Sequence, residues 1–337
     1  MKLFSLSLIS IFLFLTFLLD PAQSDNRVNS IQSVDEIAIT IRVLYQTNLS
    51  FTPQLFLRGN VPPLAWTNGY PLNPIGNGQY VTRINVSLSD LQQSNMVLEM
   101  KCLINDRDWQ LGANSMFKLN ADQERKMVDS AQSFTLSIYP WFYATEGIIT
   151  TIPNIYSPQL KNYRNLTIYY PPSYSENVKK IYDNLLIMHD GQNLFDPATA
   201  FLGNAWMIQN TLNPLIVNSN PDYSISDLVV IGVDNTPDRL NEYTYSKDPQ
   251  YGGGKGDMYL NFLQETIIPL IPTINSRLVV NKDNLGMLGS SLGGLISCYA
   301  GWSRSNTYSK VGCMSSSFWW NNQVSSMGCL LTVSEGF

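Results

Sequence analysis

The sequence predicts an α/β fold in which helices cover a mostly parallel sheet, preceded by a separate antiparallel β-sandwich. Two observations lead to this prediction. Between residues 30 and 140, short segments alternate polar and apolar side chains, whereas beyond residue 150 short apolar segments alternate with stretches of helix length. The chain has 337 residues, of which 44% are hydrophobic and 14% charged. This length and composition suit about two globular domains.

The first residues predict a secretory signal peptide over residues 1–24. A positively charged start is followed by an almost wholly apolar run from Leu3 to Leu19. Ala22 and Ser24 are the small residues that precede a cleavage point before Asp25. We therefore expect a secreted, extracellular protein with no membrane segment in the mature chain. In such a protein three sequons predict N-glycosylation, at Asn48, Asn85 and Asn165.

Residues 25–140 carry the pattern of the β-sandwich. Side chains alternate at period two, and turns rich in Pro, Gly and Asn separate the alternating segments. Several short strands with this spacing are typical of an antiparallel sandwich of about 100 residues. The expected strands are IAITIRVLYQ, PQLFLRG, GQYVTRINVSL, MVLEMKCLI and SFTLSIYPWFY.

Residues 150–322 carry the pattern of the α/β domain. Short apolar segments with helix-length stretches between them indicate buried parallel strands and crossover helices. The longest expected helix covers residues 256–274, where Pro269 and Pro272 should bound or kink it. The expected strands are NLTIYYPP, NLLIMHDG, DLVVIGVDN, NLGMLGSS and KVGCMSSS.

Charge and metal-binding residue types exclude several functions. The net charge is −5 and no basic run stands out, so we expect no binding to nucleic acid or to an anionic membrane. With a single histidine, His189, and widely spaced cysteines, the chain has neither a zinc pattern nor a dense disulfide framework, and we expect no metal and no cofactor. Cys298 follows the motif described next and Cys313 lies in an apolar strand, so both are expected to be buried thiols.

The segment NLGMLGSSLGGLISCYA, from Asn284 to Ala300, predicts a strand, a sharp turn and a helix, with Ser291 at the tip of the turn. Gly289 and Gly293 remove side chains that would collide in such a turn. The geometry would expose the Ser291 hydroxyl at the carboxyl end of the sheet and would aim the Leu292 N–H at a developing oxyanion. The alternative is a tight glycine turn with a passive serine.

Five ordered motifs resemble the putative-esterase family of α/β hydrolases, which includes enterochelin, feruloyl and acetyl-xylan esterase relatives. The resemblance runs from Asn154 to Asn322. It implies that Ser291 is the acyl-accepting nucleophile, that the Leu292 N–H is one oxyanion donor, and that the Gln192 backbone supplies the second. It places NTPDRLNEY beside the site without a catalytic role. The motifs are LLIMHDGQNLFDPATAF, VVIGVDNTPDRLNEYTY, YGGGKGDMYLNFLQETIIPLI, LGMLGSSLGGLIS and SSSFWWNN.

The sequence departs from this family after the nucleophile. In α/β hydrolases the acid and then the histidine of the triad follow the serine along the chain. Here the only acid after Ser291 is Glu335, no histidine follows, and residues 323–337 form a divergent tail. We therefore expect a chain that is truncated at its C-terminus and lacks the triad Asp and His. As written, it should aggregate or be retained, because apolar sheet faces would lack partners.

Two explanations of the missing base remain open. His189 could substitute as the base if its ring came within hydrogen-bond reach of Ser291. Alternatively, the reading frame is shifted, because codons for residues 329–333 can encode Phe-Ile-Asp-Ser in another frame, and this resembles the family's acid-bearing strand.

The front domain resembles starch-binding modules of the family-20 type over Ala38–Lys118. The resemblance is carried by PQLFLRGNVPPLAWTNGYPLN and VLEMKCLINDRDWQLGANSMF. It implies that Trp66 and Trp109 stack on sugar rings and that Lys101 donates a hydrogen bond nearby. Flat indole faces suit such exposed positions. In the alternative, both tryptophans belong to the core of an ordinary sandwich.

These observations predict a secreted serine carboxylic-ester hydrolase with an appended glycan-binding domain. Ser291 would form an acyl-serine intermediate, and the partners would be an ester substrate and an α-glucan or other polysaccharide. The alternative is a catalytically inactive, secreted glycan-binding protein that carries a degenerate hydrolase domain.

Overall fold

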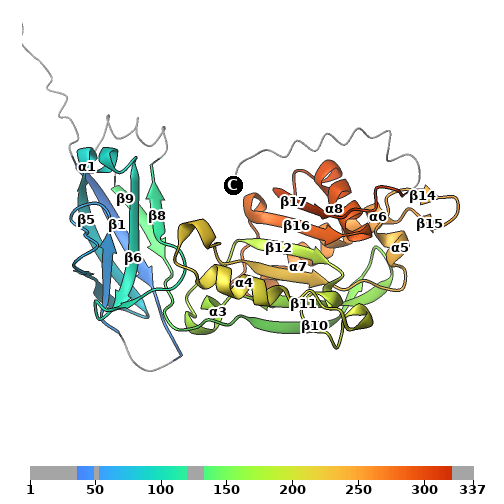
Figure 1. Ribbon diagram of the computed structural model, residues 1–337, viewed down its shortest axis with the longest axis horizontal. Coiled ribbons are helices and arrows are strands. Elements are labelled where there is room, and N and C mark those ends of the chain that lie inside the picture. Colours follow the sequence, from blue (N-terminus) through green and yellow to red (C-terminus); the bar gives the residue numbers. More distant parts are fainter. Residues whose placement is uncertain (1–35, 49–52, 120–132, 321–337) are drawn as a thin grey trace, which may run out of the picture. The chain divides into compact units, whose positions relative to one another are not determined.

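The computed structural model describes residues 36–48, 53–119 and 133–320 (Figure 1). The expected signal peptide over residues 1–24 and the expected tail over residues 323–337 lie outside these ranges. Within them, no helix has both the length and the apolar character needed to cross a bilayer.

In the described residues, the N-terminal part has two β-sheets and one short helix, α1 (Leu88–Gln93). The first sheet has the order β4 (Asn73–Gly76), β5 (Gln79–Ser87), β1 (Glu36–Leu44), β9 (Ser133–Ile138). The second has the order β3 (Tyr70–Pro71), β2 (Leu55–Gly59), β6 (Val97–Ile104), β7 (Asp108–Trp109), and β8 (Ser115–Lys118) also pairs with β6.

Side chains of both sheets share one buried cluster. Alternate residues of β1 are fully buried, among them Ile39 and Ile41, and they join Leu57 of β2 and Met100 of β6. Period-two burial of this kind places every second side chain in the core.

One pairing differs from the expected antiparallel arrangement. β1 and β9 run parallel, with Ala38 opposite Ser133 and Val43 opposite Ile138. A parallel pair needs a long connection. Here the chain between the two strands passes through the second sheet before β9 returns beside β1.

The C-terminal part contains a six-stranded sheet in which four neighbouring strands are parallel. β10 (Ile148–Ser157) and β11 (Asn162–Tyr170) form an antiparallel hairpin, and β11 is also antiparallel to β13 (Val229–Val233). The remaining order is β13, β12 (Leu185–His189), β16 (Leu285–Ser290), β17 (Lys310–Met314), all parallel. The sheet is therefore mostly parallel, as expected.

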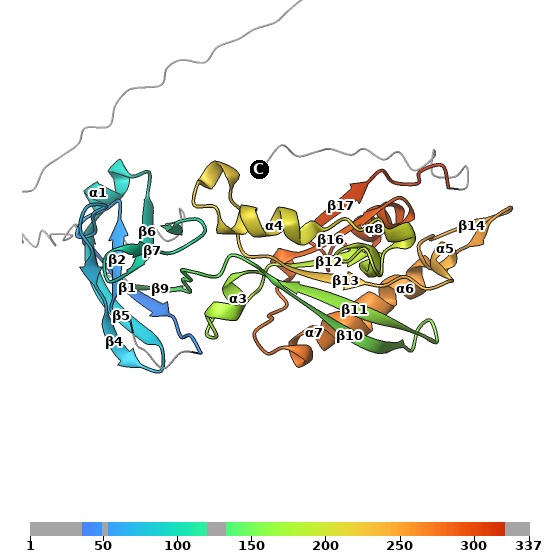
Figure 2. The same ribbon diagram turned by 60° about the horizontal axis from the view of Figure 1, so that its bottom comes forward.

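Helices lie on both faces of this sheet (Figure 2). Alternate residues of its strands belong to two different buried clusters. On one face Ile187 and Ile231 belong to a cluster with α6 (Gly256–Phe262), α7 (Ile268–Ile274) and α8 (Leu292–Ser303). On the other face their neighbours Met188 and Val230 belong to a cluster with α4 (Ile208–Val217). Short helices α3 (Ser173–Glu176) and α5 (Arg239–Glu242) and the ribbon of β14 (Lys247–Asp248) and β15 (Gly252–Gly253) complete the domain.

The expected helix over residues 256–274 is present but not regular. A π-helical turn over residues 263–267 joins α6 to α7, and it lies directly before Pro269. Proline has no N–H for the regular helical hydrogen bond, so the local change of helix type at this point has a clear cause.

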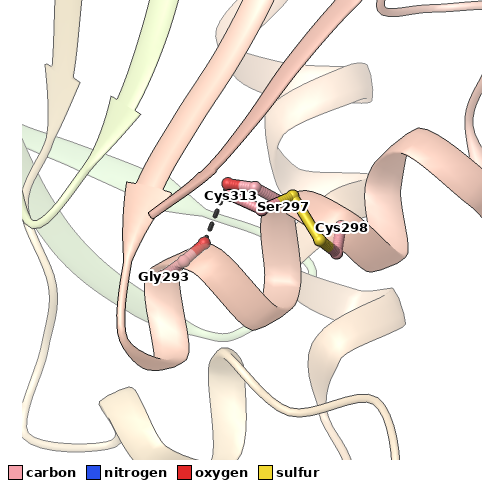
Figure 3. Close-up of a disulfide and its surroundings, with 4 residues drawn as sticks. All are labelled: Gly293, Ser297, Cys298 and Cys313. Atoms are coloured by element: carbon pink, nitrogen blue, oxygen red, sulfur yellow. Dashed lines mark hydrogen bonds between the residues drawn. A yellow bond between two sulfur atoms is a disulfide. The ribbon is translucent and has the colours of Figure 1, made fainter. Parts of the chain in front are cut away.

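A disulfide joins Cys298 of α8 to Cys313 of β17, with 5.8 Å between the two Cα atoms (Figure 3). The expectation that both are buried thiols is therefore wrong. The crossover β16–α8–β17 places α8 against β17, and this brings the two half-buried cysteines within bridging distance. Cys102 is a free, buried thiol whose pKa is raised by burial.

β17 is the last strand in the described sheet. Its outer edge has no strand partner among the described residues. Aggregation of the chain as written stays a prediction.

Candidate active site

Ser291 sits at the sharp turn between β16 and α8, as the sequence predicts. Its backbone has φ 58° and ψ −121°, a positive φ that residues other than glycine rarely adopt. Hydrogen bonds hold this conformation: the Ser291 N–H donates to the Met314 carbonyl at 3.1 Å, and the Ser291 carbonyl accepts from the N–H of Leu295 and of Ser317, each at 3.0 Å. Ser291 is exposed, so its hydroxyl is accessible at the carboxyl edge of the parallel strands.

Glycines allow the chain to make this turn. A Cβ on Gly289 would lie 2.4 Å from the Gly293 carbonyl oxygen and 2.6 Å from Cδ2 of His189. A Cβ on Gly294 would lie 2.5 Å from the Ser316 hydroxyl oxygen. The expectation of a collision is confirmed for Gly289 but not for Gly293, where a Cβ would meet no atom closer than 3.3 Å. Gly294 is instead the second position at which a side chain has no room.

The two expected oxyanion donors come from elements that lie side by side. Leu292 begins α8, and N–H groups in a first helical turn have no partner within the helix and favour negative charge. The loop with Gln192 follows β12 directly. A Cβ on Gly293 would lie 3.3 Å from Cβ of His189 and 3.4 Å from Oδ2 of Asp190, so the start of α8 touches the start of that loop.

An ion pair and an asparagine hold the loop in place. The Asp190 carboxylate accepts from Arg239 Nε at 2.7 Å and from Arg239 Nη2 at 2.8 Å, and it also accepts from Asn235 Nδ2 at 2.6 Å. The Asn235 N–H donates to Oε1 of Gln192 at 3.1 Å. Both partners belong to NTPDRLNEY, a motif for which the sequence suggested no role. Two features of the sequence could have pointed to this ion pair: the single arginine in that motif, Arg239, and the aspartate that directly follows β12, Asp190.

His189 is a buried structural residue in this arrangement. Its Nδ1 is 2.9 Å from the Tyr259 hydroxyl, and its Nε2 has no hydrogen-bond partner among the described residues. Burial lowers the pKa of His189 to about 4, so the ring is neutral at pH 7. The Ser291 hydroxyl contacts Ser317 instead. The alternative in which His189 serves as the base finds no support in the structure.

Sequence analysis missed Ser317, which belongs to the motif SSSFWWNN. Its Oγ lies 3.1 Å from Oγ of Ser291, and the residue is 4% exposed. The next two residues, Phe318 and Trp319, are exposed aromatics, whereas Trp320 is buried and donates from Nε1 to the Ser246 carbonyl at 3.0 Å. Long-range contact alone reveals the role of Ser317, because no local pattern marks it.

An apolar groove of about 440 Å³ lies between α4 and the sheet. This volume is within the range of small-molecule sites. One lining residue is Met314, whose carbonyl accepts from the Ser291 N–H. The others are Leu186, Met188, Trp206, Ile208, Thr211, Leu212, Leu228, Val230 and Leu288.

The described residues contain no group of three or more His, Cys, Asp or Glu side chains that could hold a metal ion.

In the N-terminal part, Trp66 and Trp109 lie together on the surface. They are 38% and 40% exposed, and their ring centroids are 6.3 Å apart. The Arg58 guanidinium lies 5.2 Å from the Trp109 ring and donates to the Trp66 carbonyl. The alternative that both tryptophans are core residues is wrong. Lys101 lies opposite Arg58 in the β2–β6 pairing, but it is only 6% exposed, and burial lowers its pKa.

The three sequon asparagines differ in accessibility. Asn48 and Asn85 are exposed. Asn165 lies half-buried in β11, where its Oδ1 accepts from the Asn154 N–H at 3.2 Å and its side chain is hydrogen-bonded to Asp234.

Comparisons with known proteins complete this description. Residues 157–330 match the family model described as putative esterase, slightly more than half of the chain. The uncharacterized protein YbbA of Bacillus subtilis is 28% identical over 159 residues, which cover 47% of this chain and 59% of YbbA. The chain thus spans less than two thirds of that relative.

Solved structures show partial likeness. The BES protein of Bacillus cereus is 19% identical with a TM-score of 0.42, over 53% of this chain and 65% of that one. The enterobactin esterase FES of Shigella flexneri, crystallised with enterobactin, is 14% identical with a TM-score of 0.38, over 85% of this chain and 72% of that one.

Proposed function

The chain belongs to the putative esterase family, and on that premise we propose that it is a secreted serine carboxylic-ester hydrolase with an appended glycan-binding domain. One observation carries the catalytic part of the proposal. Ser291 presents an exposed hydroxyl from a strained turn at the carboxyl edge of the parallel strands, and the first amide of α8 follows it directly.

The proposed reaction is acyl transfer through the serine. The Ser291 oxygen attacks the ester carbonyl carbon, and the negative charge moves to the carbonyl oxygen, where the N–H groups of Leu292 and Gln192 stabilise it. The intermediate collapses, the alcohol leaves with a proton, and an acyl-serine remains. Water then attacks the acyl carbon and releases the acid. Asp190 and Arg239 contribute by holding the loop that carries Gln192.

The sequence has no histidine after Ser291, and its only later acid, Glu335, lies outside the described residues. In serine hydrolases the loss of the histidine alone lowers turnover about a million-fold. Reaction with a strong electrophile is therefore a better first test than turnover of an ester.

The second part of the proposal concerns a glycan. Two neighbouring indole rings, both about two-fifths exposed, form a surface on which the C–H faces of sugar rings can stack. An α-glucan or another polysaccharide is the proposed ligand. Arg58 lies beside the same surface and can donate hydrogen bonds to hydroxyl groups.

A fluorophosphonate probe and a starch pull-down test both parts with the chain as it exists. We expect the probe to label the wild-type protein and to leave Ser291→Ala unlabelled. We expect the protein to bind insoluble starch, and the double variant Trp66→Ala/Trp109→Ala to lose binding while it keeps its labelling. Starch binding without any labelling would favour the alternative of an inactive glycan-binding protein. Labelling without starch binding would contradict the proposal that the chain binds a glycan.

Secretion and N-glycosylation are further parts of the proposal. The disulfide between Cys298 and Cys313 supports them, because such bonds persist in oxidising compartments. We expect expression in a eukaryotic secretory host to yield a chain that begins at Asp25. Glycopeptide mass spectrometry should find higher occupancy at Asn48 and Asn85 than at Asn165, whose side chain is already hydrogen-bonded. An uncleaved leader, or full occupancy at Asn165 alone, would contradict this.

A further inference from the structure

We propose that Ser317 is a positioning residue for the nucleophile, and that its hydroxyl donates a hydrogen bond to the Ser291 oxygen and stabilises that oxygen as it loses its proton. The inference rests on the proposed function of Ser291, and it assigns the motif SSSFWWNN a part in the reaction.

The backbone holds Ser317 rigidly against the nucleophile. The Ser317 N–H donates to the Ser291 carbonyl at 3.0 Å, and the Ser317 carbonyl accepts from the Trp320 N–H at 3.0 Å. Between these two backbone contacts the Ser317 side chain is buried, and its Oγ lies 3.1 Å from Oγ of Ser291. An approach this close between two hydroxyl oxygens is within hydrogen-bond distance, so one of the two donates to the other.

Chemistry decides which hydroxyl donates when the nucleophile is activated. The Ser291 hydroxyl gives up its proton to solvent water or hydroxide as its oxygen reacts, and an oxygen without a proton can only accept. Ser317 is then the donor. The bond becomes charge-assisted at the moment when charge develops on the Ser291 oxygen, and bonds of that kind are shorter and stronger than neutral ones. The contact therefore favours the reactive form over the resting form.

The ionisable side chains beside the turn include His189, whose ring lies next to Gly289, and the Asp190–Arg239 ion pair. Burial keeps His189 neutral, since its pKa is lowered to about 4. Burial raises the pKa of the two phenols that contact His189, Tyr243 and Tyr259. His189 and these two phenols are therefore uncharged at neutral pH.

The neighbouring Ser316 provides a matched control. Its hydroxyl is also buried, but it has no hydrogen-bond partner among the described residues. Ser316→Ala thus removes the same atom one residue away without removing a bond to the nucleophile. Ser317→Thr restores the hydroxyl and serves as the rescue.

The experiment measures the rate of fluorophosphonate labelling at one fixed pH, together with the melting temperature, in the full chain and in the three variants. We expect Ser317→Ala to label about tenfold more slowly than the wild type, because one hydrogen bond to a charged oxygen is lost. Ser316→Ala should match the wild type, and Ser317→Thr should recover most of the rate.

Each result separates this inference from the proposed function. A wild type that labels at the same rate as Ser317→Ala overturns the inference and leaves the proposed function standing. A slower Ser317→Ala with a lowered melting temperature, whose rate Ser317→Thr does not recover, indicates a purely structural role and also overturns it. If the wild type does not label at all, the proposed function fails, and the inference fails with it.

Discussion

Replacing Glu242 with alanine is expected to lower the free energy of unfolding by about 3–5 kcal/mol, because it leaves the Arg164 guanidinium charged, buried and unpaired. Both side chains are 0% exposed. Arg164 donates to the Glu242 carboxylate from Nη1 and from Nη2, each at 3.0 Å. A charge taken out of water in this way requires its partner.

The surroundings offer Arg164 only partial compensation. The Asp234 carbonyl accepts from Nη1 at 3.4 Å, and the Arg164 charge acts to lower the pKa of the Asp234 carboxyl, although burial, the larger effect, raises that pKa to about 6. Asn162 donates to Oε1 of Glu242 at 2.7 Å and accepts from Nη2 of Arg164 at 2.8 Å, so it is tied to the same pair. The rings of Tyr259 and Phe262 face the guanidinium, at 5.5 Å and 4.9 Å. Cation–π contact contributes at most about 2 kcal/mol and does not replace a carboxylate.

Urea unfolding of the wild type and of Glu242→Ala measures the effect. If the slope of the unfolding free energy against urea concentration is unchanged, both proteins expose the same amount of surface on unfolding. The matched control is Arg164→Met/Glu242→Leu, which removes both charges together. Replacement of a buried pair by apolar side chains is often neutral, so we expect this double variant to be much more stable than Glu242→Ala. A loss below 1 kcal/mol in Glu242→Ala would contradict the prediction.

Local sequence patterns predicted the nucleophile turn because the strand, the glycines and the helix that form it follow one another directly in the sequence. An apolar strand, two glycines and an apolar helix surround Ser291, and the structure places them as β16, the turn and α8. The contacts that hold the site came from elsewhere in the chain. Asp190 and Arg239 are 49 positions apart, and Ser317 is 26 positions after Ser291. Hydrophobic periodicity and turn propensities carry no information about contacts between residues so far apart in the sequence.

The same limit explains the N-terminal sheets. Alternation predicted that one face of β1 is buried, and Ile37, Ile39 and Ile41 are at most 1% exposed. Alternation does not determine the partner of a strand or its direction, and the parallel pairing of β1 with β9 was not foreseen. The exposed tryptophan pair was expected from family resemblance rather than from pattern, since an apolar ring in a strand is equally compatible with a core.

Loss of the disulfide is expected to lower the free energy of unfolding by about 3 kcal/mol, because the bond closes a loop of roughly fifteen residues in the unfolded chain. The sequence did not predict this pairing, because Cys298 lies on a helix and Cys313 on a strand. Only the β16–α8–β17 crossover brings the two residues together. The bond joins α8 to β17. Both of these elements form hydrogen bonds with the Ser291 backbone: Leu295 of α8 donates to its carbonyl, and Met314 of β17 accepts from its N–H.

Cys298→Ala/Cys313→Ala, compared with the wild type in urea with and without a thiol reductant, measures this contribution. The reductant should lower the stability of the wild type to that of the double variant and should leave the double variant unchanged, because Cys102, the other cysteine among the described residues, carries no disulfide. Fluorophosphonate labelling of Ser291 should slow in parallel, since α8 and β17 are then free to separate at the turn. If the double variant is as stable as the wild type and labels at the same rate, the disulfide contributes neither to the fold nor to the geometry of the nucleophile.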